Sequence, residues 1–166
     1  LSMGKILAYG GIMQDQEVSW LPSYGPEMRG GTCNVSVVLS DKKISSPVLS
    51  KFDTAVILNQ QSMDKFENQV KPGGLLIYDT NGITRHPERK DIKICRIDAV
   101  EEAAKLGNAK AYNMVVLGAY LKMKPVVTMD NVIKGLKKSL PPRRHNLIPM
   151  NEQAITVGMN AVVEVK

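Results

Sequence analysis

Apolar residues at two different spacings divide the first forty residues into one helix and two strands. From Ser2 to Gln14 they recur at helical spacing, which predicts a helix. Glu17 to Leu21 then predicts a short strand, and Cys33 to Leu39 a longer one. In the longer strand apolar residues alternate with serines, so we expect one buried face, made by Val35, Val37 and Leu39.

The middle of the chain predicts a β-α-β unit. Thr54 to Leu58 is a continuous apolar run, typical of a strand buried on both faces. A helix should follow, capped by Ser62, with Asp64 in its first turn and an apolar face of Met63, Phe66 and Val70. Lys71 to Gly74 should end it, and Leu75 to Tyr78 is a second apolar strand. The two strands should be parallel, with a right-handed crossover.

The second half of the chain is predicted to be mainly helical. Ile92 to Ile97 should be the last strand, with Asp98 capping a helix from Ala99 to Leu106. Asn113 to Met123 is apolar nearly all round, which predicts a buried or interfacial helix. Met129 to Ser139 predicts a basic amphipathic helix, broken by Pro141-Pro142. Asn151 should cap a final helix to about Val163, with a small-residue stripe for close helix contact at Ala154, Gly158 and Ala161.

These elements predict an α/β fold: a three-layer α/β/α sandwich with a mostly parallel central sheet. At 166 residues the chain is expected to form a single domain, residues 1–166. No apolar run approaches the roughly 20 residues needed to cross a bilayer, and the first residues do not resemble a signal peptide. Cys33 and Cys95 lack metal-ligand spacing and are expected to be free, partly buried thiols. The cytoplasm is the expected location.

The segment from Ser19 to Asn34 is the chemically densest part of the chain. Pro22 and Pro26 fix φ and lack an N–H, which excludes a helix interior or a central strand. Gly30-Gly31 permits unusual backbone conformations or a close approach by another molecule. An ordinary connection between two strands remains the alternative to a functional loop.

Residues Trp20 to Thr32 (Trp-Leu-Pro-Ser-Tyr-Gly-Pro-Glu-Met-Arg-Gly-Gly-Thr) resemble the signature of the gamma subunit of 2-oxoacid:ferredoxin (acceptor) oxidoreductases. The resemblance continues through Leu58, the Lys71–Gly74 turn and Asn113-Met114. It implies a complex that decarboxylates a 2-oxoacid, passes the acyl group to coenzyme A and delivers electrons to ferredoxin. In that family a strand and a Gly-rich turn precede the first helix, and this sequence contains neither of them.

The resemblance also implies which subunits hold the cofactors and which bind coenzyme A. Thiamine diphosphate, Mg²⁺ and the iron–sulphur clusters belong to alpha, beta and delta subunits, while the gamma chain closes over the active site and handles coenzyme A. It implies no catalytic residue and no metal ligand on this chain alone. The implied binding residues are Tyr24, Glu27, Arg29, Gly30, Gly31 and Thr32.

Within that set, Arg29 offers a planar fork suited to phosphate or carboxylate, and Glu27 is placed to orient it. A solvent-exposed pair of little energetic value is the alternative. Tyr24 is expected to pack against a cofactor or a partner subunit, or to cap the loop. Among 2-oxoacids, overall likeness favours 2-oxoglutarate, then branched-chain 2-oxoacids, then pyruvate.

The net charge of +6 is concentrated in one window. Residues 131–151 hold Lys134, Lys137, Lys138, Arg143 and Arg144 and no acid. Nucleic-acid binding is one interpretation, but no aromatic residue follows Tyr120 to stack on bases. Two other interpretations are a solvated helix face and a docking surface for an acidic partner or a phosphorylated cofactor. No nucleic-acid or membrane partner is expected.

The remaining polar residues do not suggest autonomous catalysis. His86 and His145 lie in separate polar segments without a Ser, Cys or Asp at nucleophile–base spacing, and both are expected at the surface. Asp79 to Gly82 follows a predicted strand where α/β sheets bind ligands, although a simple Asn-Gly turn is favoured. An accessory subunit fits better than a free-standing Rossmann-type enzyme.

Overall fold

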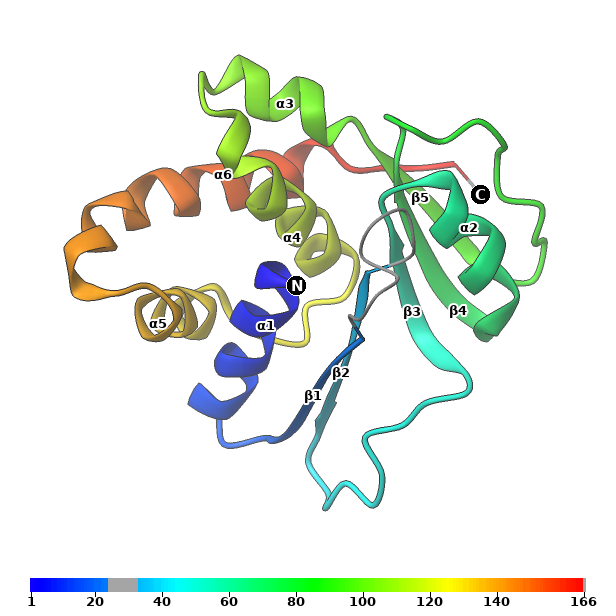
Figure 1. Ribbon diagram of the computed structural model, residues 1–166, viewed down its shortest axis with the longest axis horizontal. Coiled ribbons are helices and arrows are strands. Elements are labelled where there is room, and N and C mark those ends of the chain that lie inside the picture. Colours follow the sequence, from blue (N-terminus) through cyan, green and yellow to red (C-terminus); the bar gives the residue numbers. More distant parts are fainter. Residues whose placement is uncertain (24–32, 166) are drawn as a thin grey trace. The chain divides into compact units, whose positions relative to one another are not determined.

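The computed structural model describes residues 1–23 and 33–165. Its backbone divides into two compact units (Figure 1). Unit 1 comprises Leu1–Leu49 and Pro125–Glu152, and unit 2 comprises Ser50–Lys124 and Gln153–Lys166. No helix in the described part of the chain is long and apolar enough to cross a membrane.

Unit 1 packs two helices and a β-hairpin. Helix α1 (Ser2–Met13) contacts strands β1 (Glu17–Ser23) and β2 (Asn34–Ser40), which pair antiparallel in a two-stranded sheet. An added Cβ on Gly4 would lie 2.7 Å from a methyl group of Val35, and one on Gly11 would lie 2.6 Å from Leu39. The predicted apolar face of β2 therefore packs on α1, although every residue of β2 is only half-buried.

Helix α5 (Met129–Ser139) lies against α1 and matches its predicted bounds. Thr128 caps it by accepting a hydrogen bond from the N–H of Asn131. The Gln14 side chain joins the two helices, since it donates to the carbonyl of Val126 at 2.7 Å and accepts from the N–H of Thr128 at 3.2 Å. Helix α5 ends before Pro141-Pro142, as predicted, and a 3₁₀ segment (η4, Pro142–Leu147) follows.

Unit 2 contains a four-stranded sheet in the order β3-β4-β5-β6. Strands β3 (Phe52–Ile57), β4 (Val70–Asp79) and β5 (Lys93–Ile97) are parallel, and the short β6 (Val163–Glu164) pairs antiparallel with β5. Helix α2 (Gln60–Phe66) and a 3₁₀ turn (η2, Glu67–Gln69) connect β3 to β4. The predicted β-α-β unit with parallel strands is confirmed.

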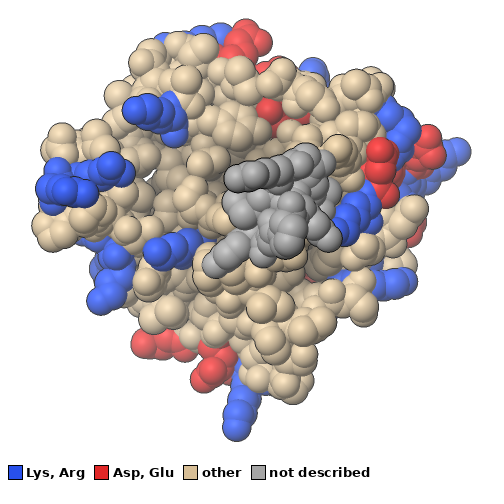
Figure 2. All heavy atoms as spheres, viewed as in Figure 1, with Lys and Arg blue, Asp and Glu red and all other residues tan. Residues whose placement is uncertain are grey.

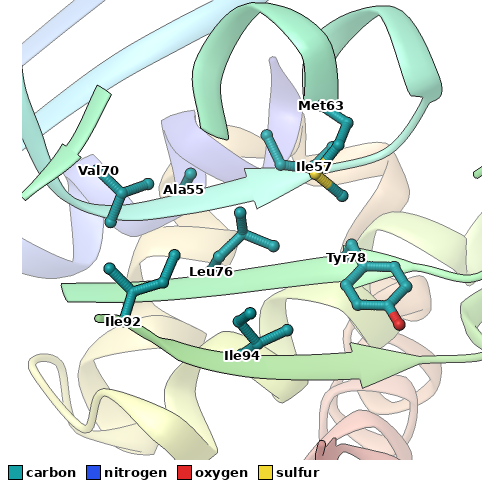
Figure 3. Close-up of a cluster of buried hydrophobic side chains, with 8 residues drawn as sticks. All are labelled: Ala55, Ile57, Met63, Val70, Leu76, Tyr78, Ile92 and Ile94. Carbon is teal, nitrogen blue, oxygen red and sulfur yellow. The ribbon is translucent and has the colours of Figure 1, made fainter. Parts of the chain in front are cut away.

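Apolar side chains cover both faces of β4. Leu76 and Tyr78 join a buried cluster with Ala55, Ile57 and Met63 of α2 (Figure 3). Leu75 and Ile77, equally buried, point to the opposite face, where α4 (Tyr112–Met123) contacts the strand. A mixed α/β fold with a mostly parallel sheet flanked by helices is thus confirmed.

Three further helical elements complete the chain: α3 (Ala99–Lys105), the 3₁₀ turn η3 (Ala109–Ala111) and α6 (Ile148–Ala161). In unit 2, α4 and α6 meet at two glycines. A Cβ on Gly118 would lie 1.9 Å from the carbonyl oxygen of Ile155, and one on Gly158 equally close to that of Val115. The small-residue stripe therefore permits close backbone contact, as predicted.

Three predicted features of the β3-β4 region are wrong. Asn59, not Ser62, caps α2, because its side chain accepts a hydrogen bond from the Ser62 N–H at 2.8 Å. The helix ends at Phe66, so Val70 belongs to β4 and not to the helix. The Lys71–Gly74 segment also lies within β4, where the register with β3 shifts and Gly73 has φ of 76°.

Four further features of strands and helix caps differ from the predictions. Strand β3 is an edge strand with alternating burial, so the predicted burial on both faces is wrong, and Leu58 lies beyond it, 36% exposed. Strand β5 is not the last strand, because β6 follows near the end of the chain. Asp98 precedes α3 but makes no capping hydrogen bond. Asn151 lies inside α6, where its side chain donates to the carbonyl of Leu147 at 2.8 Å.

Candidate functional site

The β1–β2 hairpin holds both ends of the segment that the sequence singles out. Its last pair is Ser23 with Asn34, and Pro22 stands opposite Val35. A proline is tolerated here because each strand of a two-stranded sheet is an edge strand. The six predicted binding residues (Tyr24, Glu27, Arg29, Gly30, Gly31 and Thr32) lie outside the described residues.

Two large apolar side chains of β1 are exposed to solvent. Trp20 pairs with Val37 and is 38% exposed, and the neighbouring Leu21 is 39% exposed. Cys33, which directly precedes β2, is exposed, whereas Cys95 of β5 is fully buried. Burial raises the pKa of the Cys95 thiol, so only Cys33 has the accessibility that thiol chemistry requires.

The carboxyl end of β4 carries a closed polar cluster. Asp79, 1% exposed, accepts hydrogen bonds from the N–H of Ala99 at 3.0 Å and from the hydroxyl of Tyr112 at 2.9 Å. Burial and the negative charge of Asp79 raise the pKa of Tyr112, so this hydroxyl stays protonated and donates. The Thr80 hydroxyl donates to Asp98, which explains why Asp98 does not cap α3. The turn interpretation of Asp79–Gly82 fits this geometry, since both carboxylates are occupied.

A buried carboxylate fixes the segment that follows, residues 83–91. Glu67, with a side chain 5% exposed, accepts hydrogen bonds from the Arg85 guanidinium at 2.8 Å and from the backbone N–H groups of Glu88 and Arg89. Arg89 in turn donates to the carbonyls of Glu67 and Val70. We call these residues the Glu67 clamp: Glu67, Arg85 and Arg89, with the backbone of Glu88.

Electrostatics within the Glu67 clamp favour the ionised carboxylate. Burial alone would raise the pKa of Glu67, but hydrogen bonds from Arg85 and two backbone N–H groups outweigh it, so the pKa lies below its ordinary value. Gln60 adds to the clamp, because its side-chain oxygen accepts from the N–H groups of Thr84 and Arg85 at 2.8 Å each. Sequence patterns alone do not predict this network.

The basic window forms an exposed surface on unit 1. We define the α5 basic surface as Lys134, Lys137, Lys138, Arg143 and Arg144, all of them exposed. Within the described ranges none of the five makes an ion pair. Lys and Arg atoms are visible at the left of Figure 2, where Figure 1 draws α5 and the segment after it.

The two histidines have structural partners in the described chain. His145 donates from Nε2 to the carbonyls of Leu140 and Lys137, at 3.0 and 3.1 Å, and so satisfies the end of α5. It is only half-exposed, whereas His86 is exposed as predicted and lies 3.4 Å from the hydroxyl of Tyr78 through Nδ1. No cluster of three or more His, Cys, Asp or Glu side chains that could hold a metal occurs among the described residues.

Comparison with known proteins places the chain in one family. The family model described as pyruvate ferredoxin/flavodoxin oxidoreductase matches residues 1–161. The ketoisovalerate oxidoreductase subunit VorA of Methanothermobacter thermautotrophicus is 33% identical over 95% of this chain, which spans 33% of that relative. The 2-oxoglutarate synthase subunit KorC of Methanocaldococcus jannaschii is 32% identical, with 83% of this chain and 75% of the relative covered. The chain is thus about a third of the length of VorA.

Solved structures support the same relationship. The gamma subunit of a keto/oxoacid ferredoxin oxidoreductase from Geobacter sulfurreducens superposes with a TM-score of 0.79 and 25% identity, covering 95% of this chain and 88% of that one. A 2-oxoglutarate:ferredoxin oxidoreductase from Magnetococcus marinus, solved with 2-oxoglutarate, coenzyme A and succinyl-CoA bound, has a TM-score of 0.84 at 20% identity. It covers 96% of this chain and 28% of that chain, and at this identity it shows the fold.

Proposed function

This chain belongs to the pyruvate ferredoxin/flavodoxin oxidoreductase family, as a gamma-type subunit of 2-oxoacid:ferredoxin oxidoreductases, and we propose its function on that premise. It acts within a multi-subunit complex that oxidatively decarboxylates a 2-oxoacid to its acyl-CoA and passes the electrons to ferredoxin. Its partners are alpha, beta and, where the complex has one, delta subunits. The match over residues 1–161 is the observation that carries this proposal.

The proposed substrate is 2-oxoglutarate. KorC, of which this chain covers 75%, supports it, and so does the fold shared with the Magnetococcus marinus enzyme. The similarity to VorA supports a branched-chain 2-oxoacid as the second candidate. Pyruvate is the third, since the family model also carries that name.

The proposed role of the chain is to close over the active site and to bind coenzyme A. Tyr24, Glu27, Arg29, Gly30, Gly31 and Thr32 would make these contacts. Support comes from the β1–β2 hairpin, because the pairing of Ser23 with Asn34 ties the two ends of the segment together. The sequence places Pro22 and Pro26 in this segment, and because proline has a fixed φ, less backbone entropy would be lost when Arg29 binds an anionic group.

Thiamine diphosphate, Mg²⁺ and iron–sulphur clusters are assigned to the partner subunits. This assignment follows from the family resemblance, and among the described residues no three or more His, Cys, Asp or Glu side chains gather into a possible metal site. We further propose that residues 1–166 act as a single gamma-type domain in a three-layer α/β/α arrangement and that the complex is cytoplasmic. The parallel sheet of unit 2, with α2 and α4 on its two faces, supports that arrangement.

Substitution of Arg29 tests the proposed role. Arg29→Lys keeps the charge but loses the bidentate fork, so coenzyme A-dependent turnover of the assembled complex should fall about ten- to a hundredfold. The measurement is steady-state kinetics with varied coenzyme A, paired with a thermal melt of the chain, whose midpoint should stay nearly unchanged.

Lys42→Arg is the charge-conserving control, because Lys42 is exposed, lies outside the α5 basic surface and makes no ion pair with a described residue. It should leave turnover unchanged. Wild-type kinetics for both Arg29→Lys and Arg29→Ala would contradict the proposal. An earlier melt with normal kinetics would instead make Arg29 a structural brace.

A further inference from the structure

We propose that a pocket in unit 2, about 370 Å³ in volume, binds a small organic molecule through a carboxylate or phosphate group. Its polar lining consists of Tyr78, Thr80, His86 and Arg96. Pro87, Ile94 and Val165 supply its apolar lining. This site goes beyond the function proposed above, since it uses none of the residues between Ser19 and Asn34.

The pocket lies where two parallel strands end. Tyr78 and Arg96 are partners in the register of β4 and β5, each one residue before the last of its strand. Ligands of open α/β sheets bind beyond the carboxyl ends of the strands, where side chains from neighbouring strands converge. The Tyr78 ring sits at this end of the sheet, and its hydroxyl points away from the buried apolar cluster (Figure 3).

Arg96 makes the pocket suitable for an anion. It is exposed, and within the described ranges it forms no ion pair or side-chain hydrogen bond, so all five N–H donors of its guanidinium are available. The nearby carboxylate of Asp98 accepts the Thr80 hydroxyl and does not pair with Arg96. A planar fork of this kind fits the paired oxygens of a carboxylate or phosphate.

The Tyr78–His86 pair supplies another donor. With 3.4 Å between the Tyr78 oxygen and Nδ1 of His86, one hydrogen bond joins them at most, and either atom can be the donor. If Tyr78 donates, the imidazole proton is on Nε2 and free; if Nδ1 donates, the Tyr78 hydroxyl is free. Either arrangement leaves one donor for a ligand. Burial, and the charge of Asp98, raise the pKa of Tyr78 despite Arg96, so its hydroxyl remains neutral.

One wall of the pocket is held rigidly. His86 and Pro87 lie in the segment 83–91, which Gln60 fixes at the N–H groups of Thr84 and Arg85 and which the Glu67 clamp fixes at Glu88 and Arg89. Held on both sides, the two residues need little ordering when a ligand binds. The opposite wall belongs to the sheet itself, through Ile94 and Arg96 of β5.

The volume indicates what kind of anion fits. A space of about 370 Å³ lies within the range of small-molecule sites and exceeds a bare oxyanion, so the ligand should carry an organic part against the apolar lining. Benzoate and phenyl phosphate are therefore suitable probes, because they place either anion on the same ring. Benzyl alcohol is the uncharged control.

The test is NMR titration of the full chain with each probe at constant ionic strength. We expect saturable shifts at the Thr80 amide and the His86 ring with at least one of the two anions, and none with benzyl alcohol. Arg96→Gln should weaken anion binding about ten- to a hundredfold, because a charge-assisted contact is lost. Arg143→Gln removes an equally exposed arginine from unit 1 and should change nothing at Thr80 or His86.

The stronger of the two anions identifies the ligand class as a carboxylate or a phosphate ester. Absence of saturable shifts with both anions would overturn the proposal. Equal binding of benzyl alcohol, or equal loss in Arg96→Gln and Arg143→Gln, would overturn it as well. Because the titration needs no partner subunit, its failure would leave the proposed role of Arg29 in the complex untouched.

Discussion

Two sets of basic side chains, one in each unit, serve opposite purposes. In unit 2, Arg85 and Arg89 donate to Glu67, to Asp91 and to backbone carbonyls, and they hold the segment 83–91 in place. In unit 1, the five cations of the α5 basic surface have no acidic partner in the described chain. The first set builds structure, and the second is available to another molecule.

Burial of the acidic partner accounts for the difference. The Glu67 side chain is 5% exposed, so its hydrogen bonds to Arg85 and to the backbone are shielded from water and compensate for its desolvation. The α5 cations project into solvent, where an ion pair would contribute little even if an acid were present. A positive surface left unpaired in this way favours encounter with an acidic partner more than it stabilises unit 1.

Removing the Glu67 carboxylate should produce the largest effect. Glu67→Gln keeps the shape but leaves Arg85 without its buried counter-charge, and we expect a loss of about 2–4 kcal/mol in the free energy of unfolding. Urea denaturation followed by circular dichroism measures it. Glu88→Gln is the matched control: Glu88 is also an Arg85 partner, at 3.6 Å, but is 78% exposed, so its loss should be well under about 1 kcal/mol. Similar losses for the two variants would remove the distinction between buried and exposed pairs.

Acidification should weaken the Glu67 clamp selectively. Because the folded-state pKa of Glu67 lies below its ordinary 4.5, the stabilisation is complete above that value and is lost as the pH falls through the folded pKa. Unfolding free energies between about pH 7 and about pH 3 should therefore converge for wild type and Glu67→Gln. The pKa values of Asp64 and Asp91 are also lowered, by hydrogen bonds from Gln60 and from Arg89 respectively, but both groups are well exposed. If the difference in unfolding free energy between wild type and Glu67→Gln stayed constant down to acid pH, the ionised Glu67 carboxylate would not be the source of the stabilisation.

The elements that the sequence predicts well are those set by local pattern. Helix α5 has the predicted bounds because its apolar period, its Thr128 cap and the following prolines all agree. Strands β3 and β4 are parallel because two apolar runs flank a single helix. One cap prediction failed because of a distant side chain: Asp98 accepts from Thr80, eighteen residues away, and makes no capping hydrogen bond to α3.

The Glu67 clamp shows why long-range side-chain contacts could not be predicted from the sequence. Its contacts join residues 18 to 22 positions apart, and sequence spacing does not reveal that Glu67 is buried while Glu88 is exposed. The density of charge between Arg85 and Asp91 was the available signal. At the candidate site, the sequence predicted the two strands that carry the segment, whereas the six binding residues stay a prediction.

The smallest expected effect concerns repulsion within the α5 basic surface. Lys134 and Lys138 are one helical turn apart on α5, and like charges at this spacing cost a helix about 0.2–0.5 kcal/mol. Lys134→Glu replaces the repulsion by a favourable pair with Lys138 and should raise the free energy of unfolding by about 0.5 kcal/mol, with Lys134→Gln giving about half as much. The gain should shrink in high salt, because both side chains are exposed. Chemical denaturation at low and high ionic strength, with the three proteins measured side by side, is sensitive enough. If Lys134→Glu instead destabilised unit 1, Lys134 would already make a stabilising contact within the chain. The α5 basic surface would then contribute to the fold and would not be free to bind a partner.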